Sequence, residues 1–276
     1  FSRVNAAMEM EPMEAAGVAS GYGLNVAERA GLELAMLQVK LAEKLEKLSF
    51  WGRIFGDTAD YLVAVATDSS SSFPTKKFYY ATTHSPEMLS QMPVLSEAFQ
   101  QKAATATRTP FTGDPSTPLA EEEPPADGEQ PEVFREEHRL AYHVKYLIDA
   151  DASVVPCGAL VVDASRNVVP NAHYQGLTFE KAGFLTSYFH FRSPTSPHAQ
   201  KALANVLVRP ADFLDPLSAD TPAGAWSLHF DASKRIAFLR SLYYPGALFF
   251  HLINSPSYGN LYVGDGLPNT DLPFML

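Results

Sequence analysis

The first strong pattern along the chain is helical. Asn25 is a good N-cap, and Glu28 follows at the spacing of a capping box, so the sequence predicts a helix that begins there. Leucines then recur at intervals of three and four, which places them on one helix face: Leu34, Leu37, Leu41, Leu45 and Leu48. We expect this stripe to pack on the protein's own sheet, because most amphipathic helices face their own core. Docking of a partner helix is the alternative.

After the helix, the spacing of the apolar residues changes to a period of two. Three runs rich in aromatic and β-branched residues, at 50–56, 61–66 and 77–82, predict an antiparallel meander. Four further strand-like runs lie near the C-terminus and are joined by short connections, which favours antiparallel neighbours; they are residues 226–230, 235–239, 247–253 and 260–263.

The segment between these two groups of strands is less clear. Residues 153–163 resemble a strand interrupted by Pro156, whereas residues 141–148 fit either a helix or a strand. Thr178 is placed to cap a helix that runs through Phe184 and Leu185 toward Tyr188. Ser196 is placed to cap another helix, with Pro197 at its first helical position.

These elements predict an α+β fold, with an N-terminal helix and antiparallel β-meander followed by a β-rich C-terminal part with a few helices. We divide the chain into four parts: an extended arm at 1–24, the helix plus meander at 25–116, an acidic proline-rich linker or loop at 117–137, and a C-terminal α+β part with an apolar tail at 138–276.

Two of these parts allow more than one interpretation. Carboxylates and prolines crowd residues 117–137, so this segment buries too little apolar surface to offset its ordering entropy. We expect a flexible linker or surface loop; recruitment of a basic partner is the alternative. The apolar tail, residues 272–276, would lose burial energy if it stayed in water, so we expect it to dock either on its own domain or on a neighbour.

Charge and cysteine content narrow the function. The net charge of −10 argues against direct binding to nucleic acid and against contact with an anionic membrane. No apolar run approaches the roughly 18 residues that span a bilayer. The single cysteine, Cys157, allows no intramolecular disulfide, which favours a reducing compartment.

Candidate catalytic residues are few. Cys157 lies in an apolar strand context that is typical of a buried, inert thiol. His138 and His143 are five residues apart, on different faces of a helix, and His190 lies between two phenylalanines as a packed or hydrogen-bonded histidine would. Asp163 and Glu180 could share acid–base work, as could any two carboxylates.

Phosphate-binding signals are also weak. The Gly-x-Gly at residues 264–266 lacks the third glycine, and Pro268 blocks the helix that a dinucleotide site needs. The sequence therefore assigns no catalytic, cofactor-binding or metal-binding residue and no cofactor, and it favours a scaffold or binding role over an enzyme.

Several segments resemble a known family. Residues 50–56 and 59–64 are similar to the Trp-Gly-Arg-Ile and Ala-Asp-Tyr motif of radial spoke head proteins, which head protein 9 shares with its paralogues, head proteins 4 and 6. Further segments resemble the head protein 9 family in order along the chain: residues 111–116, 137–140, 155–160, 187–192, 213–215, 224–227, 239–242, 244–246, 258–259, 262–264 and 271–276.

This resemblance implies a non-catalytic structural subunit of the radial spoke head, in the axoneme of a motile cilium or flagellum. It implies packing with head proteins of the 4/6 type and with other head and stalk subunits. The head would touch the central-pair projections and transmit mechanical signals toward the dynein arms. A soluble cytosolic adaptor and an unrecognised enzyme are the alternatives.

Overall fold

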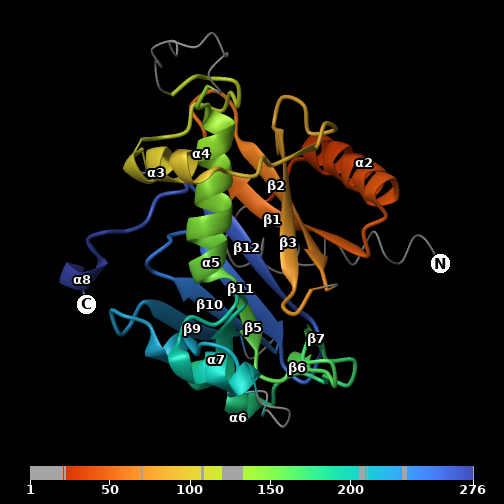
Figure 1. Ribbon diagram of the computed structural model, residues 1–276, viewed down its shortest axis with the longest axis vertical. Helices are drawn as coiled ribbons and strands as arrows, with labels where there is room; N and C mark the ends of the chain where they lie inside the picture. Colours follow the sequence, from red (N-terminus) through yellow and green to blue (C-terminus); the bar gives the residue numbers. More distant parts are fainter. Residues whose placement is uncertain are drawn as a thin grey trace.

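One eight-stranded sheet runs through the protein (Figure 1). The structure is a computed structural model that describes residues 21, 23–69, 71–106, 109–119, 133–204, 209, 211–231 and 235–275. The strand order is β4-β3-β2-β1-β12-β11-β10-β9. Its strands are β1 Lys47–Ile54, β2 Tyr61–Asp68, β3 Thr75–Thr82, β4 Ser90–Gln91, β9 Trp226–Asp231, β10 Ile236–Ser241, β11 Ala247–Leu252 and β12 Tyr258–Gly264.

Along the chain, two small sheets and most of the helices lie between β4 and β9. Strand β5 (Val154–Pro156) pairs with β8 (Tyr188–His190), and β6 (Leu160–Val162) pairs with β7 (Val168–Pro170). The helical elements are α2 Val26–Glu43, α3 Glu97–Thr105, α4 Glu136–Tyr142, a π-helical stretch at His143–Ile148, α5 Asp149–Ala152, α6 Phe179–Ala182, α7 Pro197–Leu203, α8 Leu272–Met275 and two 3₁₀ turns at Leu185–Ser187 and Leu217–Ala219.

The first and last strands of the large sheet meet at its centre. Strands β1 and β12 run parallel, with Gly52 opposite Tyr262. The remaining strand pairs of this sheet are antiparallel, so each half is a meander that starts or ends at the centre. Segments from both ends of the chain thus share one hydrogen-bonded sheet.

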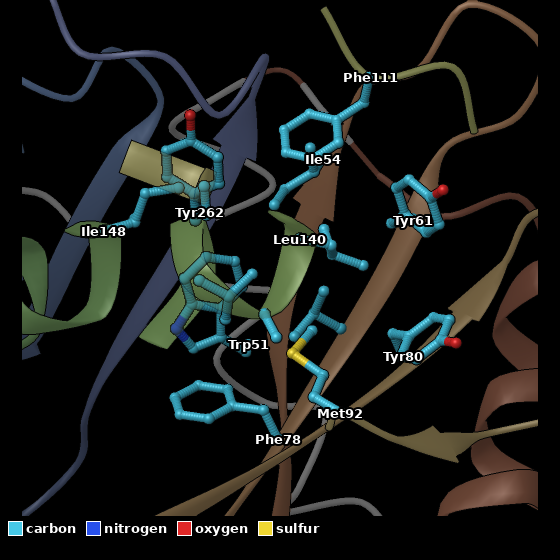
Figure 2. Packing of buried hydrophobic residues seen from close by; sticks show 14 of the residues in the cluster. Trp51, Ile54, Tyr61, Phe78, Tyr80, Met92, Phe111, Leu140, Ile148 and Tyr262 are labelled. Atoms are coloured by element: carbon cyan, nitrogen blue, oxygen red, sulfur yellow. The ribbon is translucent and has the colours of Figure 1, made fainter. Parts of the chain in front are cut away.

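The helix formed by α4 to α5 covers one face of this sheet (Figure 1). Leu140, Val144 and Ile148 pack there against aromatic side chains of the strands. Trp51 lies at the centre of this cluster, with its ring 5.4 Å from the ring of Tyr262, and Figure 2 shows both among their neighbours. The Trp51 Nε1 donates to Asp149 Oδ1 at 3.1 Å, which ties β1 to α5.

Helix α2 covers the opposite face. Side chains along β2 alternate, so Tyr61 and Val63 join the cluster under α4, whereas Leu62 joins the cluster under α2. Leu32 and Met36 of α2 are buried in this second cluster. The arrangement is a helix–sheet–helix sandwich in the N-terminal half.

Most of the predicted elements are confirmed, including the α+β class, the helix from Asn25 and both antiparallel meanders. Residues 141–148, which fitted helix or strand, are helical. The interruption predicted at Pro156 within residues 153–163 is present, but it divides the segment into two strands, because β5 ends at Pro156 and β6 begins at Leu160. A turn at Cys157 and Gly158 separates them, and Gly158 takes the left-handed φ of 87° that such a turn needs.

Parts of the predicted division lie outside the described residues. Of the arm at 1–24, residues 1–20 and 22 are not described, nor are residues 120–132 of the acidic segment. Glu136 and Glu137, which end that segment, belong to helix α4. The domain boundaries themselves stay a prediction.

Gly52 permits the close approach of β1 and β12. A Cβ at this position would lie 2.1 Å from the Tyr262 carbonyl oxygen. We expect Gly52→Ala to lower the free energy of unfolding by about 1–3 kcal/mol, because the two strands would have to separate. Urea unfolding followed by circular dichroism would measure this. The control is Gly23→Ala, since a Cβ at Gly23 meets nothing within 4 Å; equal losses in both variants would contradict the prediction.

Candidate interaction surfaces

Helix α2 carries two apolar faces, and the sheet uses only one of them. Leu32, Ala35 and Met36 are buried, whereas Leu34, Leu37 and Leu41 are 53%, 48% and 71% exposed. The spacing of three and four places these exposed leucines together on the side away from the sheet. We call them the outer leucine face.

The expectation that the leucine stripe packs on the protein's own sheet is therefore wrong for these three residues. Leu45 and Leu48 do pack against the core, but they follow the helix, and Leu48 belongs to β1. Periodicity showed an apolar face without showing which face meets the sheet, because the helix has apolar side chains on both sides.

The start of α2 is held rigidly. Asn25 Oδ1 accepts from the Glu28 amide at 2.8 Å, and Glu28 Oε2 accepts from the Asn25 amide at 3.0 Å. Glu28 also lies 3.4 Å from Arg53 of β1, whose guanidinium donates to Asp60 at 2.7 Å. These links fix the helix on the sheet, so the outer leucine face is a preformed surface.

The C-terminal tail is divided between core and surface. Leu272 is buried against its own domain, which is one of the two docking places expected for the tail. Phe274 and Met275 are 89% and 71% exposed on α8, at a corner of the molecule away from α2 (Figure 1). Leu276 lies outside the described residues.

The histidines singled out in the sequence are not brought together as a site. His138 packs between Phe99 and Phe134, whereas His143 packs on Phe111 and its Nδ1 donates to the Gly266 carbonyl at 2.9 Å. His190 is a hydrogen-bonded histidine, with its Nε2 2.8 Å from Asp220.

The other candidates also occupy separate places. Cys157 is half-buried, and burial raises the pKa of its thiol. Asp163 accepts the Asn167 amide in the turn between β6 and β7, whereas Glu180 is exposed on α6. Within the part of the chain that the structure describes, no three metal-ligating side chains gather and no helix is long and apolar enough to cross a membrane.

Sequence reasoning missed a polar pocket of about 370 Å³ beside β8 and β9. His190 lines it together with Asp151, Arg192, Asp220 and Trp226. Their spacing along the chain gives no sign of this gathering, because four separate segments supply them. The available signal was the set of resembling segments at 187–192, 224–227, 239–242 and 244–246, each of which supplies a lining residue.

Comparison with known proteins decides the family. Residues 5–140 match the model of the radial spokehead-like protein family. The chain is 37% identical over 267 residues to a radial spoke head protein 9 homolog of Danio rerio, covering 94% of this chain and 95% of that one. It is 34% identical to the homologs of Homo sapiens and Bos taurus, covering 93% of this chain and 95% of each. The chain belongs to the radial spokehead-like family.

This radial spokehead-like chain is accordingly a radial spoke component. Radial spoke head proteins are axonemal components of motile cilia and flagella, which agrees with the location that the sequence motifs implied. The matched residues 5–140 include α2 and its outer leucine face as well as the first meander.

Proposed function

We propose that the protein is a non-catalytic structural subunit of the radial spoke head, which helps to transmit mechanical signals from the central pair toward the dynein arms. The observation that carries this proposal is the outer leucine face on a helix that is fixed to a continuous sheet. A subunit that transmits force needs a stiff body and a firm attachment. The continuous sheet would supply the stiff body, and the outer leucine face would supply the attachment.

The outer leucine face suits a helix of a head protein of the 4/6 type. Fully burying a leucine side chain contributes about 1.5–3 kcal/mol, so three half-exposed leucines supply enough to support a specific contact. Leu34, Leu37 and Leu41 have the spacing of residues by which a helix docks into an apolar groove or against a second helix. Other head and stalk subunits and the central-pair projections would meet the remaining surface.

The double variant Leu37→Glu/Leu41→Lys tests the attachment. Both new residues are strong helix formers, and they form a favourable pair four residues apart, so we expect the free energy of unfolding to change by no more than about 0.5 kcal/mol. Binding to a head protein 4/6 paralogue should weaken at least about tenfold, because charged groups would enter an apolar contact. Calorimetry with the purified paralogue would measure it.

The matched control is Met88→Lys/Val94→Glu, which charges two exposed apolar side chains outside α2. It should bind as the unchanged protein does. If both double variants bind equally well, the outer leucine face is not the attachment surface.

The same variants test the cellular role. In a flagellated cell, the tagged protein should stay with the axoneme after detergent and then sediment with other spoke proteins after chaotropic extraction. The Leu37→Glu/Leu41→Lys protein should leave with the detergent-soluble fraction, and the beat should lose coordination. An unchanged protein that is itself detergent-soluble as a small species would overturn the structural proposal.

A further inference from the structure

The polar pocket beside β8 is formed by segments that are distant in the sequence. Residues 187–192, 224–227, 239–242 and 244–246 each contribute to its lining, and each was among the segments singled out in the sequence. None of them takes part in the outer leucine face. A volume of about 370 Å³ is at the lower end for small-molecule sites and accommodates one long side chain.

Asp220 is held in one orientation on the pocket wall. Its carboxylate accepts from Trp226 Nε1 at 2.7 Å and from His190 Nε2 at 2.8 Å. A carboxylate has about four acceptor positions, so Asp220 keeps free capacity. Its side chain is 29% exposed, which leaves it within reach of a ligand.

The acceptors of this pocket are the carboxylates of Asp151 and Asp220. Because the Asp220 carboxylate accepts from Nε2 of His190, that nitrogen carries a proton. Two buried nitrogens, Nδ1 of His190 and Nε of Arg192, have no hydrogen-bond partner among the described residues. The Asp151 carboxylate lies 3.8 Å from Arg192. A ligand that donates hydrogen bonds can therefore use the two carboxylates.

The charge of the pocket also favours a cation. Two carboxylates, Asp151 and Asp220, share the pocket with one guanidinium, Arg192. Burial raises the pKa of Asp151, Arg192 and then His190 act in the opposite direction, and the charge of Asp220 raises it again. An added cation would relieve the repulsion between the two carboxylates.

Aromatic side chains complete the wall. Trp226, Tyr243 and Tyr244 line the pocket, and such rings attract cations and cover the aliphatic stem of a long side chain. Among biological cations the guanidinium fits best, because it is planar, stacks on rings and pairs with carboxylates through a fork of donors.

We propose that this pocket binds an arginine side chain presented by a neighbouring protein of the spoke head. The ion pair would lie among aromatic rings, with the guanidinium between Asp151 and Asp220 and the stem against Trp226. This inference rests on the proposed function for its source of arginine, but the chemistry of the pocket can be measured without the assembly.

The two tryptophans of the chain provide the readout. The full chain is labelled with ¹⁵N at its indole groups and titrated with N-acetyl-arginine amide; Trp226→Phe assigns the resonances. We expect the Trp226 indole signal to shift with a millimolar dissociation constant, as for other single-side-chain ligands. Trp51, buried in the other cluster, should not shift.

Matched ligands and variants test the charge argument. N-acetyl-citrulline amide has the same shape without the charge and should bind at least about tenfold more weakly. Asp151→Asn should weaken arginine binding by a similar factor, whereas Asp57→Asn, an exposed carboxylate away from the pocket, should leave it unchanged. Equal binding of both ligands, or a Trp226 signal that never moves, overturns the proposal.

A further arm identifies the source of the cation. If a neighbour supplies the arginine, Asp151→Asn weakens association with purified spoke head proteins while Asp57→Asn does not. If Asp151→Asn binds the small ligand poorly but assembles normally, the pocket serves a free cation, and the assignment to a partner fails. Failure of the outer leucine face would show in the α2 variants and leave the Trp226 titration unaffected.

Discussion

Glu136→Ala is expected to lower the free energy of unfolding by about 3–5 kcal/mol, because it breaks a buried ion pair from one side. Glu136 and Arg139 are 0% and 1% exposed and lie 3.5 Å apart. Without the carboxylate, the guanidinium would remain in the core beside the ring of Phe111, whose centroid is 4.3 Å away, with its charge unbalanced.

The carboxylate of Glu136 also organises the loop before α4. It accepts from the Tyr61 hydroxyl at 2.7 Å, from the Thr112 amide at 2.9 Å and from the Gly113 amide at 2.8 Å. Each buried donor that loses its acceptor costs about 1–3 kcal/mol. The loop at 111–116 is therefore held by one side chain of the following helix.

Urea unfolding of Glu136→Ala and Glu137→Ala would test this directly. The Glu137 side chain is 27% exposed and its contact with the Tyr80 hydroxyl is 3.1 Å, so its loss should cost about 1 kcal/mol or less. Similar losses in the two neighbouring variants would show that the Glu136 network contributes little.

Acidification is expected to destabilise the protein before most carboxylates titrate. Burial lowers the pKa of both His143 and His251 to about 4. Both are neutral in the folded protein, whereas their unfolded pKa is about 6.5. The unfolded state thus binds more protons, and stability is complete above pH 6.5 and falls as the pH drops toward 4.

The expected loss is considerable. At about 1.4 kcal/mol per pH unit, protonation linked to each histidine lowers the free energy of unfolding by about 2 kcal/mol between pH 6.5 and pH 5. His251 shows why protonation is unfavourable: its Nε2 accepts from the Leu177 amide at 3.3 Å and lies 3.2 Å from the Tyr174 hydroxyl. A proton on Nε2 would turn this acceptor into a donor facing a donor.

Denaturant unfolding at several pH values between 7 and 5 measures the slope. His251→Gln should be less stable at pH 7 but should show a shallower pH dependence, since one of the two titrating groups is gone. His198→Gln, which changes an exposed histidine, should keep the slope of the unchanged protein. A flat profile in the unchanged protein would mean that the two imidazoles are not held neutral.

Local signals in the sequence predicted local structure well. The capping box at Asn25 and Glu28 located the start of α2, and the alternating runs located both meanders. The side of α2 that meets the sheet was wrongly predicted, because Leu32 and Met36 compete with the more regular leucine stripe. Choosing between two apolar faces needs the shape of the partner surface.

Features that depend on distant segments could not be predicted. Glu136 looked like one more carboxylate in an acidic stretch, because the donors that show it to be buried, Tyr61, Thr112 and Gly113, come from distant parts of the chain. The pocket around Asp220 likewise needs Asp151 and Trp226 from other elements. Resemblance located these segments, but only the fold shows that they meet.

The parallel contact between β1 and β12 has a consequence for how the protein is made. Strand β1 is synthesised about 200 residues before the strand that completes its inner edge. During translation that edge, with its unpaired amides and carbonyls, is open to any other strand. The newly made chain therefore needs protection until residues 258–264 have left the ribosome, and a premature stop before them leaves an aggregation-prone half-sheet rather than a shorter working subunit.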